Sequence, residues 1–237
     1  MKLEIGYKHS FEIRRETFVV NTPDNFSILY LSDLHLNKFS KSIITSLIAK
    51  IEFLNPTILL LGGDYVDSKK GLIHFANLLR SISLRENTFA IAGNHDIYFG
   101  IDEIEKIITE HNVVWLEGKS FTLNLPNSKL KIDGNIITKA ENDYDLSILV
   151  LHKPIDINLI QNVYNIALAG HLHGCQFVLW ESEDKLFPGK FFYRWNILKA
   201  ALTKGNYYIS KGLGDTLPIR YNCKRDLLFI QVINNNT

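Results

Sequence analysis

Five short, mostly apolar runs punctuate the chain, and each is bounded by turn residues. Such runs are typical of strands buried in a covered sheet. They are FSILYL at 26–31, TILLL at 57–61, FAIA at 89–92, LSILVL at 146–151 and YNIALA at 164–169. The pattern therefore predicts five buried strands whose ends meet loops.

Helical spacing of apolar residues appears around the first three runs. Segments 40–55, 71–82 and 101–112 each place apolar residues on one face, and Ser40 or Ser42 can cap the first of them. The second half instead shows short strand patterns, many of them alternating. We expect an α/β fold in which two facing mixed sheets are flanked by helices. No repeat, low-complexity tract or linker interrupts the sequence, so we expect one domain over 1–237.

Residues that bind metals well stand directly after each apolar run. The motifs are SDLH, GGDYVD, GNHD, LHKP and GHLHG, and they supply Asp33, His35, Asp64, Asn94, His152, His171 and His173. Functional groups of open α/β sheets collect at the carboxyl ends of strands, where loops converge. A mixed set of nitrogen and oxygen ligands without thiolate suits Mn²⁺, Fe or Zn²⁺, and Mn²⁺ is our leading expectation.

The five motifs, in this order, resemble those of the calcineurin-like metallophosphoesterases: DxH, GDxxD, GNHD or GNHE, a single His, and GHxH. The resemblance implies an αββα sandwich. The stretch GLG…LPIR…C at 212–223 and FEIRRETFVV at 11–20 also resemble one branch of that family. That branch includes bacterial phosphodiesterases and the UDP-2,3-diacylglucosamine pyrophosphatases of lipid A synthesis. The chain departs from the branch at Gly174-Cys175-Gln176, where Gly-Gly-Gln is usual.

The resemblance also implies a ligand set for two divalent cations. One cation would be held by Asp33, His35, Asp64 and His173, and the other by Asp64, Asn94, His152 and His171. Two cations about 3.5–4 Å apart clamp a phosphoryl group and lower the pKa of a bridging water, which then attacks phosphorus as hydroxide. The implied reaction is hydrolysis of a phosphodiester or pyrophosphate bond.

Two residues of the GNHD motif are expected to act on the substrate side. The resemblance gives His95 the part of a general acid or charge stabiliser, and we expect Asp96 to orient its ring. Asp67 is expected to be a hydrogen-bonding loop residue or helix cap. Three further histidines match no motif and are expected to be structural or surface residues: His9, His74 and His111.

Composition narrows the location and the partners. The formal net charge of +1 gives no general attraction to nucleic acid, and we expect no nucleic-acid partner. No apolar stretch approaches the ~20 residues of a membrane helix, and the start lacks an apolar signal core. Cys175 and Cys223 are expected to be free thiols in a reducing compartment. We therefore expect a cytoplasmic protein that can lie against the inner membrane.

The segment 185–225 holds nine basic residues, one acid and many aromatic residues. We expect this segment to meet an anionic, partly apolar partner, such as a membrane face or a lipid-linked substrate. Arg220 is the candidate for a second phosphate contact, and Lys153 is a weaker one. A lipid-linked pyrophosphate such as UDP-2,3-diacylglucosamine is our favoured substrate. A soluble phosphodiesterase for nucleotides and a metal-free binding scaffold are the alternatives.

Overall fold

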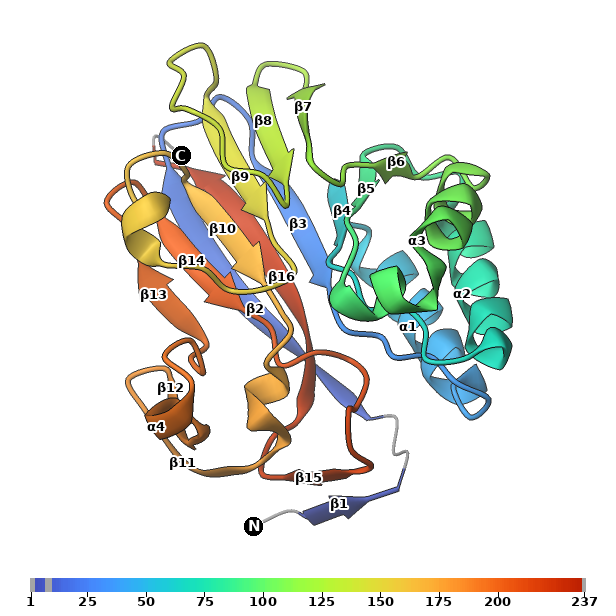
Figure 1. Cartoon of the computed structure of the whole chain (residues 1–237). Coiled ribbons are helices and arrows are strands. Elements are labelled where there is room, and N and C mark those ends of the chain that lie inside the picture. The colour runs from blue at the N-terminus through green and yellow to red at the C-terminus, as the bar shows by residue number, and fades with distance from the viewer. Residues whose placement is uncertain (1–2, 7–9, 236–237) are drawn as a thin grey trace.

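The computed structural model describes residues 3–6 and 10–235. Two six-stranded sheets lie face to face, as Figure 1 shows. In spatial order, the first sheet contains β2 (Phe11–Val20), β16 (Arg225–Asn234), β3 (Phe26–Leu31), β4 (Ile58–Leu61), β5 (Thr88–Ala90) and β6 (Val114–Trp115). The second contains β13 (Lys199–Ala201), β14 (Asn206–Ile209), β10 (Ile166–Ala169), β9 (Leu146–Val150), β8 (Lys129–Gly134) and β7 (Lys119–Asn124).

Both sheets are mixed, with parallel strands at their centres. β3, β4, β5 and β6 run parallel, and so do β8, β9, β10 and β14. Antiparallel pairs join β16 to β3, β7 to β8 and β13 to β14. The carboxyl ends of the parallel strands of each sheet therefore meet at one edge. The predicted fold class, two facing mixed sheets with helices, is confirmed.

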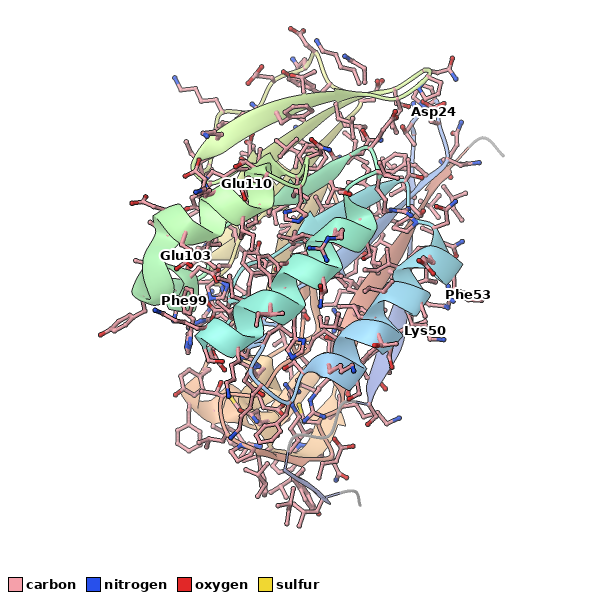
Figure 2. All side chains as sticks on the ribbon, turned by 90° about the vertical axis from the view of Figure 1, so that its right-hand side faces the viewer. Asp24, Lys50, Phe53, Phe99, Glu103 and Glu110 are labelled. Atoms are coloured by element: carbon pink, nitrogen blue, oxygen red, sulfur yellow. The ribbon has the colours of Figure 1, made fainter. Side chains whose placement is uncertain are left out.

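Three helices cover the outer face of the first sheet: α1 (Lys41–Leu54), α2 (Lys69–Ile82) and α3 (Asn94–Thr109). Figure 2 shows them side by side, with Phe53 of α1 on the solvent side. Their apolar faces bury one core cluster against this sheet, and a second cluster fills the space between the sheets. Among the described helices, none has the length and apolar character needed to cross a membrane.

The outer face of the second sheet is covered differently. There the short 3₁₀ helix η1 (Ile157–Leu159) and neighbouring loops bury Ile160 and Tyr164 against Tyr207 and its strand neighbours. This layer is thinner than the expected flanking helices. Residues 151–165 contain Pro154 and several Asn and Asp residues, which favour turns over a long helix.

Helix α3 begins seven residues earlier than the pattern predicts. Asp96 accepts a hydrogen bond from the backbone N–H of Gly93 (2.8 Å), which closes a capping box at the GNHD motif. Gly100 then interrupts the helical backbone with φ 134°, before the amphipathic part begins. The helical spacing of apolar residues is therefore absent from the first turns of α3. These turns carry the GNHD motif instead.

Smaller elements gather at the lower end of the sandwich in Figure 1. A hairpin of β11 (Val178–Ser182) and β12 (Lys185–Pro188) leads into the short helix α4 (Gly189–Phe192). Nearby, β1 (Leu3–Ile5) pairs with β15 (Ile219–Tyr221). The 3₁₀ turn η2 (His173–Gln176) connects β10 to this region.

Candidate metal centre

The metal-binding residue types meet at the edge where the parallel strands end. Their motifs follow β3, β4, β5, β9 and β10 in turn. Several of these residues have left-handed backbone conformations, with φ of 54° at Asp33, 43° at His35, 56° at Asp64, 72° at His171 and 51° at His173. Such conformations cost on the order of 1–3 kcal/mol each and are typical of functional sites.

One group of ligand atoms comes from β3 and β10. The Nε2 atoms of His35 and His173 lie 3.2 Å apart, and Asp33 Oδ1 is 3.7 Å from His173 Nε2. All three side chains are buried. Three potential ligand atoms thus converge on one point from two different sheets.

A second group comes from α3, β9 and β10. His152 Nε2 lies 3.0 Å from Asn94 Oδ1 and 3.2 Å from His171 Nδ1. The other ring nitrogen of His152 is 3.0 Å from the carbonyl oxygen of Gly62, so this N–H donates to it and Nε2 is free to bind a cation.

Asp64 lies between the two groups. Its Oδ2 atom is 3.7 Å from His35 Nε2 and 3.2 Å from His152 Nε2, while Oδ1 accepts a 2.7 Å hydrogen bond from the His95 amide. Ligand atoms that each bind one cation at about 2.0–2.2 Å are separated by roughly 3–3.5 Å. The observed spacings fit two cations that share the Asp64 carboxylate.

The electrostatics of the site match this chemistry. Burial raises the pKa of Asp64, but its hydrogen bond to His152 and the nearby imidazoles outweigh burial and lower it to about 2. Burial lowers the pKa of His152, and the hydrogen bond to Asp64 and the charges of Asp33 and Asp64 raise it to about 9. Burial also lowers the pKa of His173 to about 4. The Asp64 carboxylate is therefore ionised at neutral pH, and a cation that binds His152 displaces a proton from it.

Asp67 lies beside two site histidines. One carboxylate oxygen, Asp67 Oδ1, lies 2.8 Å from His35 Nδ1 and 3.3 Å from His95 Nδ1. The prediction that Asp67 is a hydrogen-bonding loop residue is confirmed: its hydrogen-bond partner is His35, and His95 lies within ion-pair distance. The GDxxD spacing was the only sequence signal for this contact, because the partners come from other strand ends.

Asp96 has a different role from the predicted one. Its carboxylate accepts hydrogen bonds from the backbone amides of Asp64 (2.7 Å), Tyr65 (2.9 Å) and Gly93 (2.8 Å), and the residue is fully buried. This placement corrects the expectation that Asp96 orients the His95 ring. Asp96 instead fixes the backbone that carries Asp64 and the start of α3.

Arg220 also lies elsewhere than predicted. It is 1% exposed, and its guanidinium donates to Asp215 (2.6 Å) and to the carbonyl oxygens of Lys211 (3.0 Å) and Gly214 (2.6 Å). These bonds correct the expectation of a free phosphate contact. Lys153 is exposed beside His152. Burial, and then the charges of His152 and Lys153, lower the pKa of His171.

The charge excess of segment 185–225 is largely neutralised by acids elsewhere in the chain. Lys199 pairs with Glu16 (3.1 Å) and Lys211 with Glu12 (2.7 Å). Further ion pairs join Arg194 to Asp156, Lys224 to Glu12, and Arg225 to Glu4. The excess of +8 that the segment has in sequence is therefore mostly balanced by acids from outside the segment.

The aromatic residues of the same segment divide into two sets. Tyr207 and Tyr208 are buried, and Trp195 packs against the core of the second sheet. Phe191 and Phe192 are exposed, and together with Trp180, which precedes the segment, and the aliphatic Leu217 they form what we call the apolar rim; the four are 70%, 79%, 47% and 62% exposed. The rim lies on β11, α4 and the loop before β15.

Two pockets adjoin the histidines. The Tyr98 pocket, about 410 Å³, is lined by Val66, Asp67, His95, Tyr98 and Phe99. Phe99 marks its place at the lower end of α3 in Figure 2. The Leu217 pocket, about 340 Å³, includes His171, Leu172, His173, Tyr193, Thr216 and Leu217. A phosphorus atom at the centre therefore has space on two sides.

The remaining predicted structural residues stay outside this arrangement. His74 lies on α2, and His111 lies just beyond α3, where its Nδ1 is 2.7 Å from the Ile107 carbonyl oxygen. His9 is outside the described residues. Cys175 and Cys223 are free thiols, as predicted, and Cys175 borders the Leu217 pocket.

Residues 26–196 match the family described as calcineurin-like phosphoesterase. This range covers most of the chain and contains all five motifs. The protein belongs to the calcineurin-like phosphoesterase family. It is a metal-dependent phosphoesterase of a family that uses a dinuclear divalent metal site.

Individual relatives agree with this assignment. Phosphodiesterase YaeI of Escherichia coli strain K12 is 26% identical over 96% of this chain and 92% of its own length. An uncharacterized metallophosphoesterase of Campylobacter jejuni is 25% identical over 83% of this chain, which spans 56% of that relative. The calcineurin-like phosphoesterase YfkN from Bacillus subtilis has a TM-score of 0.51 at 14% identity, over 80% of this chain and 82% of that one. The last comparison shows a shared fold.

Proposed function

We propose that this protein hydrolyses phosphodiester or pyrophosphate bonds with two divalent cations. The placement of Asp64 between two ligand groups carries the proposal, because one carboxylate within reach of both is what a bridged pair needs. The first cation would be held by Asp33, His35, Asp64 and His173, and the second by Asp64, Asn94, His152 and His171. The nitrogen and oxygen donors suit Mn²⁺ first, then Fe or Zn²⁺.

When bound, the two cations neutralise phosphate charge and lower the pKa of a water molecule. The chain's own residues supply the proton for the leaving group. His95 turns Nδ1 toward Asp67, so Nε2 is left to donate a proton to the leaving oxygen. The same Asp67 oxygen accepts from His35 Nδ1, which leaves His35 Nε2 as the ring nitrogen that would bind a cation.

We further propose that the substrate is lipid-linked, with UDP-2,3-diacylglucosamine as the leading candidate. The support is the apolar rim beside the Leu217 pocket, whose aromatic rings can sit at a lipid boundary. Membrane contact through this rim would depend on apolar burial more than on charge, because the nearby cations are mostly paired. The proposed location is the cytoplasmic side of the inner membrane.

A substrate panel tests both levels of this proposal. Protein reconstituted with Mn²⁺ is given bis-p-nitrophenyl phosphate, p-nitrophenyl phosphate, cyclic nucleotides and UDP-2,3-diacylglucosamine. We expect metal-dependent cleavage of the diester and highest kcat/KM on the lipid pyrophosphate. The name of the Escherichia coli relative favours a phosphodiesterase for soluble substrates as the second candidate. Best turnover on cyclic nucleotides, without response to Phe191→Ser and Phe192→Ser, would support that candidate.

A further inference from the structure

The two pockets beside the metal-ligand residues differ in their chemistry. The Tyr98 pocket contains His95 and Asp67, the pair that can deliver a proton. The Leu217 pocket lies on the side of His171 and His173, and its other walls include Leu172, Tyr193 and Leu217. Both pockets have apolar walls, but only the Tyr98 pocket holds the His95–Asp67 pair, and the Leu217 pocket offers Leu172, Tyr193 and Leu217 beside two candidate ligand histidines.

A phosphodiester has two substituents, and only one leaves. In an in-line displacement, the leaving oxygen must lie within reach of the group that protonates it. The position of His95 therefore directs the leaving group into the Tyr98 pocket. The substituent that stays on phosphorus needs a separate space, and a phosphomonoester has no such substituent.

We propose that the Leu217 pocket binds the retained substituent of a phosphodiester, and that it selects apolar or aromatic groups. This inference rests on the proposed function. In the reaction, the water oxygen bonds to phosphorus and releases a proton to solvent. The bond from phosphorus to the leaving oxygen breaks, and that oxygen takes a proton from His95. The product in the Leu217 pocket is the phosphomonoester of the retained group.

Gln176 gives this pocket a defined wall. Its side-chain oxygen accepts from the amides of Thr216 and Leu217 (both 3.1 Å), and its nitrogen donates to the carbonyl oxygens of Leu217 (2.6 Å) and Ile219 (2.9 Å). Gln176 is 8% exposed. Every polar atom of the side chain is used to hold the loop that carries Leu217, so Gln176 is a positioning residue for the pocket.

The turn that carries Gln176 is itself unusual. All four residues of η2 have positive φ, from 51° at His173 to 59° at Gly174. The Cys223 thiol donates a hydrogen bond to the carbonyl oxygen of His173 (3.3 Å), which stabilises the turn. This left-handed backbone joins the candidate metal ligand His173 to the pocket residue Gln176. Left-handed backbone at residues other than glycine is typical of binding sites.

Two diesters with one leaving group test the assignment. Phenyl p-nitrophenyl phosphate and methyl p-nitrophenyl phosphate both release p-nitrophenolate and differ only in the retained group. We expect wild-type protein with Mn²⁺ to favour the phenyl ester, and Leu217→Ser to lower the phenyl-to-methyl ratio of kcat/KM about tenfold. Leu179→Ser is the matched control, since Leu179 is 50% exposed on β11 and lies outside the pocket lining. It should leave the ratio unchanged.

Gln176→Glu provides a second arm. It keeps the acceptor oxygen but loses the two donated bonds, so the same ratio should fall while bound metal per chain stays constant. Tyr98→Ser should not change the ratio, because Tyr98 borders the leaving-group side. An equal ratio in Leu217→Ser and wild type would overturn the pocket assignment alone. Failure of the wild type to cleave either diester with Mn²⁺, Fe²⁺ or Zn²⁺ would overturn the proposed function as well.

Discussion

Residues 26–109 and residues 176–225 differ in how far their structure follows from local sequence. In the first region, each of β3, β4 and β5 ends in a polar motif, and a helix follows each of them, beginning at Lys41, Lys69 and Asn94. In the second region, strands are short, and most cations find acids far away in the chain, such as Glu4, Glu12 and Glu16. Local pattern is enough to predict a polar motif at a strand end. The net charge of a surface depends on which distant residues fold against it.

The largest expected effect lies in the first region. Asp64→Ala removes the carboxylate that lies within reach of both ligand groups, so it should empty the site rather than halve it. We expect hydrolysis of bis-p-nitrophenyl phosphate to fall by roughly 10³-fold or more, about 4 kcal/mol of barrier. Metal content by mass spectrometry checks the cause. Two cations per chain with near-normal turnover in this variant would contradict the shared role.

The next effect tests the second region. Arg225 is 2% exposed and pairs with Glu4 (2.8 Å) and with Asp215. Arg225→Met should lower the free energy of unfolding by at least about 3 kcal/mol, because it removes the buried positive charge that faces the Glu4 and Asp215 carboxylates. Its neighbour Lys224 has an exposed side chain, and Lys224→Met should cost less than about 1 kcal/mol. Urea unfolding of both variants measures the two free energies. Equal losses of unfolding free energy would indicate that Arg225, like Lys224, is a solvated surface cation.

The third prediction concerns His95, which stands in the polar motif after β5. His95→Asn should keep two cations per chain but lose about 10²-fold in kcat on esters with poor leaving groups. The loss should shrink for p-nitrophenyl esters, since their leaving oxygen needs less protonation. His74→Asn, the same change on α2, is the matched control and should behave as wild type. Equal losses for good and poor leaving groups would argue against proton donation by His95.

The last effect, the smallest when taken per pH unit, is a pH dependence of metal binding. In the metal-free protein the pKa of His152 is raised to about 9, above its ordinary 6.5, so protonation of His152 stabilises the metal-free fold below pH 6.5 and loses this effect as pH rises through 9. A cation must displace that proton. Affinity for Mn²⁺ should therefore rise up to about tenfold per pH unit between pH 6.5 and 9. Calorimetry in two buffers counts the released protons, and a pH-independent affinity would contradict the shift.

The sequence predicted the buried strands and the convergence of polar residues, because both depend on local apolar runs and on the parallel arrangement of strands. It misjudged Asp96, since a carboxylate two positions after Asn94 looks like a partner for His95 when the capping box is unseen. It misjudged Arg220 because nothing in LPIR reveals that Asp215 and two carbonyl oxygens surround the guanidinium. Both errors concern hydrogen bonds whose partners cannot be identified from the spacing of apolar residues along the sequence.

Metal titration tests the central claim most directly. Protein stripped with a chelator is given increasing Mn²⁺, and bound metal and hydrolysis of bis-p-nitrophenyl phosphate are measured on the same samples. The arrangement of Asp33, His35, Asp64, Asn94, His152, His171 and His173 predicts two cations per chain. Full activity should appear only as the second cation binds. Hydrolysis that persists in the chelated protein, or that saturates with one cation per chain, would contradict the account.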